Sequence, residues 1–280
     1  MTGAPPTAPT SPPPLPRRTL QLTGAQRTLL IPLYAKALDY RSRNSILHDV
    51  TADNIVRSLD FDFSQFRSGD SGRMLSLRSR FLDDWVREFL ESHPTALVVH
   101  LGCGLDARIA RVGPPPSVLW VDLDLPEVIA LRRTLYAERT GYRMIVGSIA
   151  DATWLAEMPT DRPVIVVADG VLEYLPERAV RELFRRLADH FSHGVVVFDV
   201  MSSEAVRRGS ERIRSSTGAQ LQWGVDDLAA VDLFDARFRR TAAVPIIAAR
   251  DMGFGARILF GVAMLSRSLQ QMIRVVRYEF

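Results

Sequence analysis

The chain has 280 residues, of which 47% are apolar and 24% are charged, and its formal net charge is +3. This is the composition of a globular protein long enough to bury a core, which excludes a chain that is disordered throughout. A single cysteine excludes an internal disulfide and any metal site built from cysteines.

The sequence also argues against two kinds of partner, a membrane and a nucleic acid. No run of 18 apolar residues is present, so no membrane-spanning helix is expected. The 35 basic residues are scattered among 32 acids without a continuous run, which argues against a nucleic-acid-binding stripe. Because no apolar signal segment opens the chain, we expect a cytoplasmic location.

Prolines dominate the first residues, since seven of the 17 fall within residues 1–16. They predict a disordered or polyproline II tail over residues 1–20. Residues 21–94 then follow a helical pattern, with a first helix capped by Thr23 and a second running from Leu75 to Leu90. We expect these helices to form a lid, with a loop around residues 61–72.

After Pro94 short apolar runs alternate with helical segments, which is typical of a doubly wound α/β domain with a parallel sheet. This pattern predicts a core over residues 95–201 and a substrate-side insertion with helical pieces over 202–240. Two C-terminal strands are expected within 241–280. The predicted strands are 96–101, 118–121, 144–146, 164–168, 195–198, 241–248 and 273–280, and the predicted core helices are 127–139 and 177–190.

The ends of the first two predicted core strands carry residues suited to a ligand. Gly102 and Gly104 allow a sharp turn and a close backbone approach. Asp122 and Asp124 follow about 20 residues later, the spacing at which a second strand delivers a carboxylate to ribose hydroxyls. Because ligands bind beyond the carboxyl ends of such strands, a nucleoside-bearing cofactor is expected here.

Two cofactors fit this pattern. A nicotinamide dinucleotide would place its pyrophosphate on the glycine turn and a helix N-terminus. S-adenosylmethionine has no phosphate and instead needs a cation for its carboxylate and an acceptor for its ammonium group. About 95 residues of helical pattern precede the first core strand, which favours S-adenosylmethionine over a dinucleotide enzyme, whose first strand usually lies near the chain terminus.

Ordered blocks of the chain resemble the leucine carboxyl methyltransferase family, and in particular its bacterial polyketide O-methyltransferases. The likeness runs from about residue 22 to residue 203. It implies an S-adenosylmethionine-dependent O-methyltransferase with a class I fold and a polyketide-type acceptor. The blocks are LTG (22–24), TLLIPLYAKA (28–37), VVHLGCGLDAR (98–108), VDLDLPEVI (121–129), DATWL (151–155) and DGVLEYLP (169–176).

The resemblance implies roles for individual residues. Lys36, the only lysine, and Arg78 would present cations to the cofactor carboxylate, with Arg80 as a rival for the second position. Asp124 would bind the ribose, with Asp122 as the alternative. The other cofactor-binding residues expected are Gly102 and Gly104 beneath the methionyl group, Ser148, Ile149 and Asp151 at the adenine, and Asp169 at the amino group.

Some of these assignments have alternatives. Asp151 could equally cap the helix that follows. The family usually has Glu where Asp169 stands and Thr where Ala107 stands, so the carboxylate of Asp169 reaches less far.

The acceptor side of the site is less defined. Tyr174 is the candidate catalytic residue and is expected to touch the acceptor, although a packing role is equally possible. Trp223 and Phe234 could stack on an aromatic polyketide or belong to the core. His100 is expected to be structural, and no histidine stands out as a general base. A carboxylate acceptor needs no base, whereas a phenol profits from one, so the sequence favours carboxyl methylation. The alternatives are a nicotinamide-dependent oxidoreductase and a non-catalytic S-adenosylmethionine-binding module.

Overall fold

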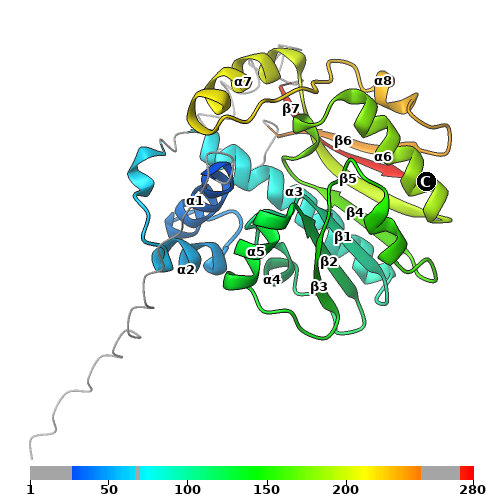
Figure 1. Cartoon of the computed structure of the whole chain (residues 1–280), viewed down its shortest axis with the longest axis horizontal. Helices are drawn as coiled ribbons and strands as arrows, with labels where there is room; N and C mark the ends of the chain where they lie inside the picture. Colours follow the sequence, from blue (N-terminus) through cyan, green and yellow to red (C-terminus); the bar gives the residue numbers. More distant parts are fainter. Residues whose placement is uncertain (1–26, 67–69, 247–271) are drawn as a thin grey trace, which may run out of the picture.

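Five short apolar runs form the parallel part of a sheet that is buried on both faces. They are β1 (Leu97–Leu101), β2 (Leu119–Asp124), β3 (Tyr142–Val146), β4 (Val164–Ala168) and β5 (Gly194–Met201). Every residue of β1 and β4 is buried, as expected for strands covered by helices on both sides. The computed structural model, shown in Figure 1, describes residues 27–66, 70–246 and 272–280.

The complete sheet has seven strands in the order β3-β2-β1-β4-β5-β7-β6. The last two are β6 (Arg239–Pro245) and β7 (Ile273–Glu279), and β7 pairs antiparallel with both β5 and β6. The strand order reverses between β1 and β4, and in doubly wound proteins ligands bind beyond the carboxyl ends of the strands at such a reversal. The α/β sheet predicted from the sequence is confirmed.

Each face of the sheet is covered by its own set of helices. On one face α3 (Asp70–Ser92), α4 (Arg108–Val112) and α5 (Pro126–Leu135) pack through Leu82, Ile109 and Ile129 against strand residues such as Val98. On the other face lie α6 (Glu177–His190), the 3-10 helix η2 (Thr153–Glu157) and α8 (Ala229–Asp232). The predicted helix over 177–190 matches α6.

The N-terminal helices pack beside the end of β1 rather than over the middle of the sheet (Figure 1). Helix α1 (Arg27–Arg41) and α2 (Val50–Ser58) share a core with the 3-10 helix η1 (Phe63–Gln65). Leu105, which follows the glycine turn after β1, is buried in that same core. This contact fixes the N-terminal helices against the turn.

Three details differ from the expectation or lie beyond the description. Helix α2, which is capped by Asp49 through a hydrogen bond from the Ala52 amide, was not predicted. The loop expected over 61–72 contains η1 and the first turn of α3. The predicted tail over 1–20 and the cap at Thr23 lie outside the described residues.

Helix α7 (Ser203–Thr217) begins the expected insertion, and α8 follows within it. None of the described helices has the length and apolarity needed to cross a membrane.

Candidate functional site

The turn after β1 is built from two glycines with left-handed backbone. Gly102 has φ +59° and Gly104 has φ +50°, a region that side chains with a Cβ rarely adopt. A Cβ on Gly102 would lie 2.4 Å from Cγ2 of Val171, in the loop after β4. The two loops at the strand-order reversal therefore approach each other as closely as glycine allows.

The two acids of the second strand have different environments. Asp124, at the end of β2, is partly exposed and accepts hydrogen bonds from the amides of Gly104 (2.7 Å) and Leu125 (2.8 Å). Burial raises its pKa, against the effect of these amides. Asp124 thus ties the end of β2 to the glycine turn and still faces the surface.

Asp122 has no exposed surface and is enclosed by partners. Its carboxylate pairs with Arg132 and accepts hydrogen bonds from Tyr142 (2.7 Å) and the indole of Trp120 (2.9 Å). Burial alone would raise the pKa of Asp122, but Arg132 outweighs it and holds that pKa well below its usual range. Since every oxygen is committed inside the core, the geometry favours Asp124 over Asp122 as the ribose ligand.

Lys36 projects from α1 into a buried cluster of charges. It is 4% exposed, and its Nζ lies 2.9 Å from Oδ1 of Asp106, just beyond the glycine turn. Burial lowers the pKa of this lysine, although Asp106 opposes the shift. Asp106 also pairs with Arg111. An ammonium group has three donors, and among the described residues the one ion pair of Lys36 is with Asp106, so Lys36 can bind a further acceptor.

Arg78 projects from α3 to the carboxyl ends of β4 and β5. Its Nε lies 2.6 Å from Asp169 and its Nη1 lies 3.0 Å from Asp199. Asp169 also pairs with Arg108 and accepts a hydrogen bond from Ser79 (2.7 Å). Burial would raise the pKa of Asp169, but Arg78 and then Arg108 hold it well below its usual range.

The rival arginine points elsewhere. Arg80 is about half exposed, pairs with Asp84 at 2.8 Å and donates to the carbonyl of Ile46. Of the two candidates, Arg78 is therefore the one that the fold brings to the strand ends.

Glu173 is a buried acid that the sequence analysis did not single out. It is 6% exposed, and burial followed by the charge of Asp199 raises its pKa to about 8, against the effect of Arg78. A signal was present, because Glu173 is the only charged residue between Gly170 and Pro176, directly after a predicted strand.

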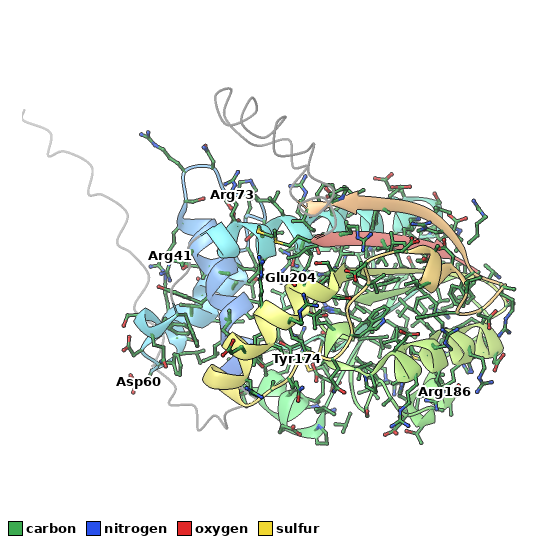
Figure 2. The ribbon with its side chains drawn as sticks, turned by 90° about the horizontal axis from the view of Figure 1, so that it is seen from above. Arg41, Asp60, Arg73, Tyr174, Arg186 and Glu204 are labelled. Carbon is green, nitrogen blue, oxygen red and sulfur yellow. The ribbon has the colours of Figure 1, made fainter. Side chains whose placement is uncertain are left out.

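Tyr174 follows Glu173 in the 3-10 helix η3 (Leu172–Tyr174). In the view of Figure 2 it lies in the central part of the molecule, between Arg41 on the N-terminal side and Arg186 of α6. Burial, and then Glu173, raise the pKa of its hydroxyl above the usual range.

The residues expected at the adenine follow β3. Ile149 is buried in the main core, Ser148 is half-buried and Asp151 is exposed. The alternative in which Asp151 caps a helix is wrong, because η2 begins after Ala152 and has no side-chain cap. The expected contact of Asp151 with adenine stays a prediction.

Other expected residues lie in the core. His100 is 1% exposed, with Nδ1 3.3 Å from Asp122, so its predicted structural role is confirmed. Trp223 and Phe234 are also buried and pack on each other in the main core, at 6.1 Å between ring centroids. Of their two expected roles, the structure therefore supports packing.

The charges at these strand ends form one continuous cluster in which acids outnumber bases. Six carboxylates surround four cations, linked mainly through ion pairs with Arg108 and Arg111. The carboxylates are Asp49, Asp83, Asp106, Asp169, Glu173 and Asp199, and the cations are Lys36, Arg78, Arg108 and Arg111.

This cluster fits S-adenosylmethionine better than a dinucleotide. Even with Glu173 neutral, five carboxylates stand against four cations, and this excess of negative charge disfavours a pyrophosphate and favours a cofactor that carries a positive sulfonium. Cations for a carboxylate, an acid for an ammonium group and two glycines without a Cβ atom are all present in the loops after β1 and β4. Helix α4, which follows the turn, has only five residues, so its N-terminus is poorly suited to bind a phosphate.

Comparison with known proteins agrees with this assignment. Residues 30–188 match the family described as leucine carboxyl methyltransferase. The tetracenomycin polyketide synthesis O-methyltransferase TcmP of Streptomyces glaucescens is 43% identical over 210 residues, which cover 74% of this chain and 77% of that protein. The S-adenosyl-L-methionine-dependent methyltransferase dpfgK of Gibberella zeae is 36% identical over 229 residues, with the same two coverages.

Solved structures share the fold at low sequence identity. The S-adenosylmethionine-dependent methyltransferase from Mesorhizobium loti aligns with a TM-score of 0.51 and 16% identity, covering 71% of this chain and 98% of that chain. This likeness concerns the fold alone.

Proposed function

The chain belongs to the leucine carboxyl methyltransferase family and is an S-adenosylmethionine-dependent methyltransferase, and from this premise we propose that it methylates an oxygen atom of a polyketide-type small molecule. The observation that carries the proposal is the juxtaposition of Lys36, Arg78 and Asp169 in the loops after β1 and β4, where Lys36 pairs with Asp106, Arg78 pairs with Asp169, and Asp169 also acts on the charge of Lys36. The acceptor class is taken from the printed name of the Streptomyces glaucescens relative.

Each cofactor group has a matching residue in this proposal. Lys36 and Arg78 bind the carboxylate of the methionyl end, and Asp169 accepts from its ammonium group. Gly102 and Gly104 let the backbone pass beneath that end. Asp124 binds the ribose hydroxyls, and Ser148, Ile149 and Asp151 border the adenine.

S-adenosylmethionine supplies a methyl group on a positively charged sulfur. Methyl transfer is an in-line displacement, so the contribution of the chain is to hold donor and acceptor in line and to exclude water. The N-terminal helices serve this role, because α1 and α2 pack on Leu105 beside the glycine turn. The buried carboxylates of the cluster attract the cationic donor more strongly where water is excluded.

The acceptor is placed beyond the carboxyl ends of β4 and β5, beside Tyr174. The amide of Gln222 donates to the carbonyl of Glu173 (2.7 Å), and its side chain donates to the carbonyl of Tyr174 (2.8 Å). The segment after α7 is therefore held against η3, and together they form the acceptor side. Tyr174 is proposed to contact the acceptor here.

The proposal is tested by methyl transfer from methyl-labelled S-adenosylmethionine to a panel of aromatic polyketides that carry hydroxyl and carboxyl groups. Label in the organic extract is expected with the wild type and is expected to fall at least tenfold with Lys36→Met. Binding of S-adenosylhomocysteine without transfer to any acceptor would favour the non-catalytic binding module. Binding of NADH or NADPH would favour the oxidoreductase.

A further inference from the structure

The turn after β1 depends on two glycines, and glycine does not fix its own conformation. Gly102 and Gly104 both have left-handed backbone, at φ +59° and +50°. A glycine adopts many backbone conformations at similar cost, so the peptide groups beside it can reorient unless other groups hold them. Contacts from outside the turn must therefore fix its shape.

Three successive peptide groups of the turn are held by such contacts. The amide of Gly104 donates to Oδ2 of Asp124 at 2.7 Å. The carbonyl of Gly104 accepts a hydrogen bond of 2.9 Å from Nη1 of Arg132. The carbonyl of Leu105 accepts one of 3.0 Å from the hydroxyl of Tyr136. Two side chains from α5 and its end thus orient the two carbonyls, while Asp124 orients the amide.

Arg132 and Tyr136 are four residues apart, a spacing that places both side chains on the same face of a helix. Tyr136 directly follows the last residue of α5, and its amide donates to the carbonyl of Arg132 at 2.9 Å, which continues the helical pattern. The guanidinium of Arg132 lies over the ring of Tyr136, 4.3 Å from the ring centroid. The two donors therefore hold each other in place.

The surroundings of both side chains fix them further. Arg132 has no exposed surface and pairs with Asp122. Tyr136 packs against the core that α1 and α2 share, in which Leu105 is also buried. Burial raises the pKa of the Tyr136 hydroxyl above its usual range, so the hydroxyl stays protonated and remains a donor near neutral pH.

We propose that Tyr136 is a positioning residue of the cofactor site, which acts with Arg132 to hold the glycine turn in the conformation that binds S-adenosylmethionine. This inference rests on the proposed function, in which the turn passes beneath the methionyl end and Asp124 binds the ribose. Tyr136 acts through the turn and not by contact with the cofactor. A site whose groups are ordered before binding loses less free energy in ordering them, so its affinity is higher.

The test is calorimetric titration of S-adenosylhomocysteine into Tyr136→Phe, which removes one hydroxyl and keeps the ring beside Arg132. The carbonyl of Leu105 then loses its donor, and the turn is free to take other conformations. We expect the affinity to fall about tenfold, equivalent to about 1.4 kcal/mol, at a temperature at which circular dichroism shows the variant to be folded. An affinity within twofold of the wild type would overturn the proposal.

Tyr278→Phe is the matched control. The buried Tyr278 donates its hydroxyl to Asp232 at 2.6 Å, and it lies in β7, which β4 and β5 separate from β1. The variant loses the same atom and a bond to a charged acceptor, so its thermal midpoint should fall at least as far as that of Tyr136→Phe. Its affinity for S-adenosylhomocysteine should stay within twofold of the wild type. An equal loss of affinity in both variants would show that lowered stability alone weakens binding, and would overturn the positioning role.

A double-mutant cycle with Asp124→Asn gives a readout that a merely structural role would not change. Because the Gly104 amide links the turn to Asp124, the effects of Tyr136→Phe and Asp124→Asn on affinity should be coupled. If each single variant loses about tenfold, the double variant should lose about 20-fold rather than about 100-fold. Losses that simply multiply would overturn the proposal. Absence of S-adenosylhomocysteine binding by the wild type would instead overturn the proposed function, and this inference with it.

Discussion

Replacing Asp122 by asparagine separates the two acids that the sequence could not distinguish. Asp122 and Arg132 both have no exposed surface, and the carboxylate also accepts hydrogen bonds from Tyr142 and Trp120. Asparagine keeps the volume and removes the charge. Arg132 would then retain the carbonyl of Gly104 (2.9 Å) as an acceptor but no buried counter-charge.

The expected loss of unfolding free energy in Asp122→Asn is about 3–5 kcal/mol, the cost of breaking a buried ion pair by removing one partner. That is a large share of a typical stability of roughly 5–15 kcal/mol. Because the pKa of Asp122 is lowered on folding, by Arg132 against burial, its contribution is full above the unfolded-state pKa near 4 and is lost as the pH falls. The deficit of the variant should therefore be constant from pH 6 to pH 8.

The assay is urea unfolding followed by circular dichroism, combined with calorimetric titration of S-adenosylhomocysteine into the folded protein. Asp124→Asn is the matched variant. We expect it to lose about 1 kcal/mol of stability, through its bonds to the Gly104 and Leu125 amides, and at least tenfold in affinity. A stable Asp122→Asn variant with weakened binding of S-adenosylhomocysteine, together with normal binding by Asp124→Asn, would refute the choice of Asp124 as the ribose ligand.

Three further predictions concern the same site. Lys36→Met should weaken S-adenosylhomocysteine binding at least tenfold with little effect on urea unfolding, because Asp106 keeps Arg111 as a partner; unchanged affinity would count against the assignment. Gly102→Ala should cost roughly 2–4 kcal/mol, since it combines a left-handed backbone with a Cβ 2.4 Å from Val171, and adding Val171→Ala should recover part of the loss. Cys103 is buried, and burial raises the pKa of its thiol well above the usual value. Iodoacetamide should therefore label it only after denaturation. Rapid labelling of the folded protein would contradict the packing of the turn.

Periodicity in the sequence predicted those elements whose pattern is long or strongly apolar. Helix α6 was predicted at its observed bounds because its apolar residues Val180, Leu183, Phe184 and Leu187 recur at helical spacing and are all buried. The strands of the core were found because each is a short apolar run ending in Gly or Asp. Helix α2 was missed because it has only nine residues and lies between polar segments.

The pairing of charges could not be read from the sequence. Asp122 and Asp124 are two residues apart and therefore lie on the same face of β2. They differ because Arg132 and Tyr142 cover Asp122, whereas Asp124 is the last residue of the strand and stays partly exposed. Two partners of Asp122, Arg132 and Tyr142, lie ten and 20 residues further along the chain. Glu173 acquires its unusual environment only when α3, β4 and β5 bring Arg78, Asp169 and Asp199 around it.

The central claim is that the cluster around Gly102 holds S-adenosylmethionine, and calorimetric titration of the wild type with S-adenosylhomocysteine tests it most directly, with NADH as the control ligand. We predict saturable one-to-one binding of the adenosyl ligand and no heat of binding with NADH. Silence with S-adenosylhomocysteine, or binding of NADH in its place, would contradict the account.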